Sequence, residues 1–216
     1  MFGCLCLTYC IPNGIMENIR RKGAFMDNKE KILRCALDLF YAKGYDAVGV
    51  QEIAEKAGVT KPTLYYYFGS KYGLLETLLN TELSHVNAAV REAAEYHGDV
   101  PATLYRMASK MLDLASANRK MYMLMMALFY SAKENEAYRA IRPLMTELYG
   151  IVVHFFEEAT PQLGNIRGRQ EQFAIGFLGT MNQYILRMCD SLKEGAMVDD
   201  ERKKSLVDQF MYGINS

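Results

Sequence analysis

Hydrophobic residues recur at helical spacing along almost the whole chain after its first 27 residues. Ile32, Ala36, Leu39 and Phe40 form one apolar stripe, and Gly44 is placed to end that helix. No stretch shows the alternation of a half-buried strand. The pattern therefore predicts an all-α fold with about nine helices. After the first, the expected helices are a short one at 51–56, another short one after Thr60, a long one from Ser70 to about Tyr96, and then 102–116, 119–133, 135–159, 168–194 and 200–213.

Two of the short helices are joined by the four residues AGVT, from Ala57 to Thr60. Gly58 permits the positive φ of a tight turn, and Ala54 is small where the two helices must cross closely. Thr60 can cap the next helix, and Pro62 is tolerated in its first turn. This spacing is typical of a helix-turn-helix.

The second helix of that pair has an unusual aromatic run, in the sequence KPTLYYYFGSK. At 100° per residue, Leu64 and Phe68 fall on one edge and Tyr66 faces the opposite way. A packed core helix explains the first two residues but leaves Tyr66 in water. Phenolic rings can contact thymine methyl groups and sugars while their hydroxyls reach phosphates, so this face is suited to DNA.

Charge supports this interpretation locally, although the chain carries 25 basic and 25 acidic residues and no net charge. Between Lys56 and Leu75 there are three lysines and no acidic residue. Lys61 lies at the start of the aromatic helix, where the positive end of the helix dipole also favours phosphate. Three lysines alone are a weak signal, but they coincide with the helix-turn-helix spacing.

The stretch AVGVQEIAEKAGVTKPTLYYYFGSKYGLLETLL resembles the DNA-binding signature of the TetR family of bacterial transcriptional regulators, and the close resemblance covers about residues 29–79. It implies phosphate contacts from Gln51, Tyr67 and Lys71. It also implies that the start and outer face of the aromatic helix approach the major groove. The implied DNA-binding set is Gln51, Thr60, Lys61, Pro62, Thr63, Tyr65, Tyr66, Tyr67 and Lys71. Gly73 departs from the family pattern and is expected to cost about 1 kcal/mol of helix propensity.

Beyond residue 79 only the length and the helical pattern match. The resemblance implies an apolar effector pocket here, and the many methionine and aromatic residues would suit it, although they equally fit an ordinary bundle core. The candidate pocket residues are Met107, Met111, Tyr122, Met126, Phe129, His154, Phe155, Phe177, Met181 and Tyr184. The resemblance also implies a homodimer built from the last two helices, with Phe173, Gly176, Gly179, Thr180, Leu206 and Phe210 as candidate interface residues.

Three segments are expected: an N-terminal extension at 1–25, a DNA-binding domain at 26–75, and an effector-binding and dimerisation domain at 76–216. Codons for the residues before Met26 are compatible with a ribosome-binding sequence, so Met26 is a candidate native start. No apolar run approaches the roughly 18 residues that cross a bilayer, so a cytoplasmic protein without a membrane partner is expected.

The leading function is a ligand-responsive repressor that binds a palindromic DNA operator as a homodimer and is released by a small apolar effector. An activator and a helix-turn-helix that binds another protein are the alternatives. An all-α enzyme is disfavoured because the three histidines are far apart and no catalytic or phosphate-binding motif occurs. No cofactor and no metal site is predicted.

Overall fold

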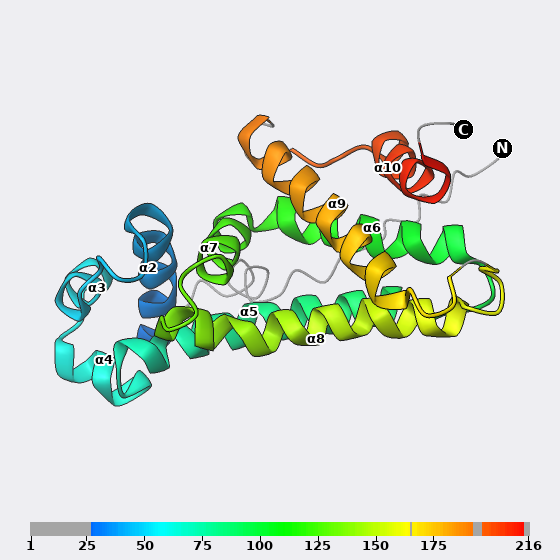
Figure 1. Ribbon diagram of the computed structural model, residues 1–216. Helices are drawn as coiled ribbons and strands as arrows, with labels where there is room; N and C mark the ends of the chain where they lie inside the picture. Colours follow the sequence, from blue (N-terminus) through cyan, green and yellow to red (C-terminus); the bar gives the residue numbers. More distant parts are fainter. Residues whose placement is uncertain (1–26, 165, 192–195, 214–216) are drawn as a thin grey trace, which may run out of the picture.

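The computed structural model describes residues 27–164, 166–191 and 196–213, and within them it contains nine α-helices and no strand (Figure 1). This confirms the predicted all-α fold. The N-terminal extension and the proposed start at Met26 lie outside the described residues. The helices are α2 (Asn28–Lys43), α3 (Val50–Ala57), α4 (Lys61–Phe68), α5 (Lys71–Ala93), α6 (Val100–Ala117), α7 (Arg119–Phe129), α8 (Glu136–Ala159), α9 (Gln170–Ser191) and α10 (Asp200–Tyr212).

Helices α2, α3 and α4 form a small cluster at one end of the molecule (Figure 1). Its centre is made of fully buried Ile32, Ile53 and Leu64, one from each helix. The turn between α3 and α4 depends on Gly58, which has a φ of 67°. The Thr60 hydroxyl then accepts a hydrogen bond from the Thr63 amide at 3.3 Å, which caps α4. The short helices are therefore fixed by local signals as well as by packing.

The long helix α5 connects this cluster to the rest of the molecule, where it runs beside α8 (Figure 1). Its inward positions include Leu75, Leu79 and Leu83, all buried. Helices α6 to α10 complete a helical domain whose buried residues are continuous with those of α2–α4. No helix among the described residues is long and apolar enough to cross a membrane.

Helices α5 and α7 end earlier than their apolar patterns predict. Side chains donate hydrogen bonds to the backbone carbonyls at these two ends. The guanidinium of Arg106 donates to the Glu95 carbonyl at 2.6 Å and to the Ala93 carbonyl at 3.3 Å, beside the end of α5. At the end of α7 the Ser131 hydroxyl donates to the Leu128 carbonyl at 2.7 Å. Such bonds satisfy carbonyls that a longer helix would otherwise use.

The last helix, α10, is held on α6 by a charged side chain that is almost fully buried. Lys203 is 6% exposed, and its ammonium lies 2.8 Å from a carboxylate oxygen of Asp113 on α6. A second carboxylate, from Asp200 one turn earlier on α10, lies 3.4 Å away. These partners raise the pKa of Lys203 above its ordinary value, although burial alone would lower it. The lysine therefore stays charged and joins the two helices.

Candidate DNA-reading surface

Helix α4 presents one face to the core and the other to solvent, as the aromatic spacing predicts. Leu64 is completely buried and Phe68 nearly so. Tyr66 is 85% exposed and Tyr65 is 46% exposed, so both rings project from the molecule. The ring of Tyr66 meets the edge of the Tyr67 ring at 5.4 Å between centroids, which limits its freedom to move. An exposed pair of tyrosines on a short capped helix is a ready contact surface.

The first turn of α4 continues this surface. Lys61 and Pro62 are exposed, and no acidic residue lies in that turn. The hydroxyls of Thr60 and Thr63 lie 2.9 Å apart and hydrogen-bond each other. Thr63 is therefore engaged in capping as well as being available at the edge of the surface. We call Lys61, Pro62, Tyr65 and Tyr66 the reading face.

The three residues expected to contact phosphate, Gln51, Tyr67 and Lys71, each contact other groups of the protein in this structure. Lys71 points inward: its ammonium donates to the carbonyls of Tyr45 and Val48 at 3.1 and 3.2 Å. The expected phosphate contact of Lys71 stays a prediction, since in this structure its ammonium is directed to these two carbonyls. Tyr67 is half-buried against the core. Gln51, near the start of α3, is exposed and donates to Glu55 on the same helix.

Gly73 is required where it stands, contrary to the expectation that it merely weakens α5. A Cβ added there would lie 2.2 Å from the carbonyl oxygen of Phe68. The Gly73 amide also donates a hydrogen bond to the Ser70 hydroxyl at 2.9 Å, and this bond caps the start of α5. The missing side chain thus allows the start of α5 to approach the end of α4 closely, a role that helix propensity alone does not indicate.

Most of the candidate effector-pocket residues are packed in the core rather than around a described cavity. The buried ones are Met107, Met111, Tyr122, Met126, Phe155, Phe177 and Met181, whereas Phe129 and Tyr184 are half-buried. Tyr122 is the polar member of this group: its hydroxyl donates to the side-chain oxygen of Asn182 at 2.9 Å. Burial raises the pKa of Tyr122 well above its ordinary value, so it remains a neutral donor.

His154, a candidate pocket residue, does not face the interior in this structure. Its side chain is 70% exposed and lies beside Glu157 and Glu158 on the outer face of α8. A helical position one residue away from buried Phe155 points in a different direction, and the sequence pattern could have shown this. Its neighbour Phe155 faces inward, with its ring 4.9 Å from that of Phe156.

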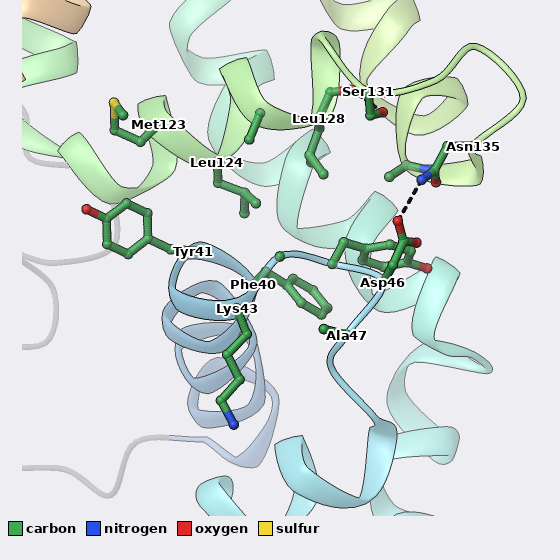
Figure 2. Close-up of a pocket in the computed structure, with 14 residues that line it drawn as sticks. Phe40, Tyr41, Lys43, Asp46, Ala47, Met123, Leu124, Leu128, Ser131 and Asn135 are labelled. Carbon is green, nitrogen blue, oxygen red and sulfur yellow. Dashed lines mark hydrogen bonds between the residues drawn. The ribbon is translucent and has the colours of Figure 1, made fainter.

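An open groove of about 510 Å³ lies between the DNA-binding cluster and the larger domain (Figure 2). One wall is the end of α2 and the turn after it, including Phe40 and Tyr41. The other wall is α7 and the turn before α8, including Leu124 and Leu128. No candidate pocket residue lines it, so the groove marks the joint between domains rather than the predicted effector pocket.

The candidate dimer residues divide between two environments. Gly179 is exposed, and an added Cβ would meet nothing within 4 Å. Gly176 is also exposed, but a Cβ there would lie 3.6 Å from the Phe210 ring of the same chain. Leu206 is buried, and Phe173, Thr180 and Phe210 are partly buried. Ile175, which was not among the candidates, is 61% exposed on α9.

A capped helix with an exposed aromatic face, packed on α2 and α3 and followed by a larger helical domain, is the arrangement of a helix-turn-helix DNA-binding domain. Residues 32–78 match the family profile described as bacterial regulatory proteins, tetR family. Residues 32–78 are therefore similar to the DNA-binding segment of the TetR family.

Curated relatives that match this chain beyond the DNA-binding region do so at lower sequence identity. The activator FasR of Mycolicibacterium smegmatis is 37% identical over 67 residues, which cover 31% of each chain. The negative regulator of the icaADBC biofilm operon in Staphylococcus aureus, IcaR, is 25% identical over 87% of this chain and 97% of its own. Several curated relatives match over only 26% to 43% of their own length.

Solved structures share the whole fold. PfmR, a TetR family regulator from Thermus thermophilus, superposes with a TM-score of 0.71 at 21% identity, covering 89% of this chain and all of that one. FadR from Bacillus subtilis, solved in complex with stearoyl-CoA, gives a TM-score of 0.70 at 19% identity, covering 86% and 98%. The similarity extends through both domains.

Proposed function

We propose that the protein is a transcriptional repressor that binds a palindromic operator as a homodimer and is released by a small, largely apolar effector. The observation that carries the proposal is the reading face of α4. Tyr66 is 85% exposed and adds nothing to the core, whereas an exposed ring on the same short helix as Lys61 can contact base edges while the lysine contacts phosphate. One helix of eight residues reads few base pairs, so two copies, spaced about 34 Å or a multiple apart, supply the specificity.

The larger domain supports a ligand-responsive role. Its interior is rich in methionine, and its overall fold is that of a FadR solved with stearoyl-CoA. A methionine-rich core can repack around an apolar ligand with little change of volume elsewhere. An effector releases DNA only when it binds the form that cannot read the operator more tightly. A regulator of this kind acts in the cytoplasm, on chromosomal DNA.

A DNA-binding measurement tests the proposal. Fluorescence anisotropy with the DNA upstream of its own gene should show binding that competitor DNA of unrelated sequence does not abolish. Tyr66→Ala should weaken specific binding about tenfold or more, because it removes a contact without disturbing the core. Tyr130→Ala is the matched control, since Tyr130 is 73% exposed on the other domain. Equal affinities of the two variants would contradict the role of Tyr66.

Activation is the second candidate, since one relative is a named activator and another a named negative regulator. Footprinting with and without RNA polymerase separates the two. A repressor competes with polymerase for the promoter, and an activator increases polymerase occupancy.

A further inference from the structure

Tyr45 lies in the turn between α2 and α3, yet it touches three other parts of the fold. It is 3% exposed, and its ring packs on Phe40 of α2 with 5.1 Å between centroids. The ammonium of Lys71, the first residue of α5, lies 4.2 Å from the centre of the same ring. The Tyr45 hydroxyl donates to the carboxylate of Glu136, the first residue of α8. One side chain thus joins the DNA-binding cluster to two helices of the larger domain.

Neighbouring bonds strengthen this joint. Asn135, which caps α8, donates its side-chain amide to the carboxylate of Asp46 at 2.8 Å, as the dashed line in Figure 2 shows. Lys71 also holds the turn from inside, through the carbonyls of Tyr45 and Val48. Val48 lies two residues before the start of α3. The beginning of α3 is therefore tied to the beginning of α8 over a very short path.

The Tyr45 hydroxyl stays protonated and can keep donating its hydrogen bond to Glu136. Burial, followed by the Glu136 carboxylate, raises the pKa of Tyr45 well above its ordinary value. The phenol consequently remains a donor at every physiological pH. A hydrogen bond from a neutral donor to a carboxylate is stronger than one between two neutral groups.

We propose that Tyr45 and Glu136 are positioning residues that set the orientation of the helix-turn-helix on the larger domain, by linking the turn before α3 to the first residue of α8. The continuous helix α5 already connects the two domains at the other end of the helix-turn-helix. Together with the Asn135–Asp46 bond and the contact of α2 with α7, the Tyr45–Glu136 link attaches the cluster at a second place and so restricts its rotation relative to α5. This inference rests on the proposed function, in which α3 and α4 engage DNA.

Hydrogen exchange of the full-length protein without DNA tests the link directly. Tyr45→Phe removes only the hydroxyl and keeps the ring on Phe40. Glu136→Ala removes the acceptor, and Glu136→Gln keeps an acceptor without the charge. Glu134→Ala is the matched control, because Glu134 is an exposed acid in the same turn that accepts a hydrogen bond from Arg139 through its backbone carbonyl. The readout is amide exchange in α3, with residues 74–83 of α5 as the internal reference.

Tyr45→Phe and Glu136→Ala should each accelerate exchange in α3 about fivefold and leave the α5 reference unchanged, which is the effect of losing one hydrogen bond locally. Glu134→Ala should behave as the wild type, and Glu136→Gln should fall between the wild type and Glu136→Ala because it keeps an acceptor but loses the charge. Unchanged α3 exchange in both test variants would overturn the proposal. So would equal acceleration in α3 and in the α5 reference, which is the result of a general loss of stability.

Operator affinity provides a second and separate readout. Tyr45→Phe should change the affinity about fivefold relative to Glu134→Ala, since it alters how often α3 and α4 are correctly oriented. Altered exchange with wild-type affinity in both test variants would overturn the positioning role. A wild-type protein that binds no DNA would refute the proposed function, while the exchange data would still decide whether the link exists.

Discussion

The buried ion pair between α10 and α6 gives a stability prediction that can be worked from its geometry. Replacing Lys203 by Met removes the charge that faces Asp113 at 2.8 Å but keeps most of the apolar stem. Removing one partner of a fully buried pair costs about 3–5 kcal/mol, because the other charge is left without compensation. The Asp113 oxygen that faces Lys203 is buried, but 31% of the side chain is exposed, so the remaining charge keeps part of its contact with water. We expect a loss of about 2–3 kcal/mol in the free energy of unfolding, which is below the fully buried range.

Urea unfolding followed by circular dichroism measures this loss, with every variant at the same protein concentration in case unfolding is coupled to dimer dissociation. Lys204→Met is the matched control, because Lys204 is exposed on the same helix, and it should change stability by less than about 0.5 kcal/mol. Adding Asp113→Asn to Lys203→Met should recover part of the loss, since it removes the uncompensated charge. If Lys203→Met costs no more than Lys204→Met, the pair contributes nothing and the reasoning is wrong.

The same pair has a defined pH dependence. Because the folded protein raises the pKa of Lys203 above its ordinary value of 10.5, its contribution is fully present below about pH 10.5. It is lost as the pH rises through the folded pKa. On the alkaline side of neutral pH, the stability difference between the wild type and Lys203→Met should therefore shrink only in strongly alkaline solution. A difference that disappears near neutral pH would contradict the assignment.

Two further predictions concern glycine and the dimer. Gly73→Ala should destabilise the protein by about 1–3 kcal/mol, since its Cβ would lie 2.2 Å from the Phe68 carbonyl oxygen. Gly150→Ala, whose Cβ would meet nothing within 4 Å, should instead stabilise α8 by about 0.5–1 kcal/mol. Thermal unfolding distinguishes the two variants, and equal effects would refute the close approach at Gly73. Ile175→Glu places a charge on the exposed face of α9 and should raise the dissociation constant of the proposed dimer about tenfold or more, whereas Gln172→Glu should leave it unchanged. Sedimentation equilibrium measures both constants. An unchanged constant for Ile175→Glu would remove this residue from the interface.

The sequence predicts the helices well because each signal that defines them is local. The Thr60 cap, the positive φ of Gly58 and the alternation of Leu64 with Tyr66 depend only on residues a few positions apart. The aromatic face of α4 was predictable for the same reason. Helix ends were less predictable: Arg106 reaches back to the carbonyls that follow α5 from another helix.

Long-range partners could not be read from the sequence. Tyr45 and Glu136 are separated by 91 positions, and nothing in either local pattern indicates the other. The partners of Lys71 were also not predictable from its place in the sequence. Its position in a basic segment suggested phosphate, but only the fold shows that the turn before α3 presents two carbonyls to it. Which residue pairs meet is decided by how the helices pack.

The composition of the reading face has a consequence for how binding responds to ions in solution. Each phosphate that a lysine or arginine neutralises releases condensed counterions and adds about 0.9 to the log–log slope of affinity against salt. Lys61 is the one cation within α4, and its neighbours on the reading face are Pro62, Tyr65 and Tyr66. In the proposed complex, α4 of each protomer would therefore add about one unit of that slope. The other contacts proposed for this helix are uncharged and are not screened by salt, so they would favour discrimination between sequences over general attraction to DNA.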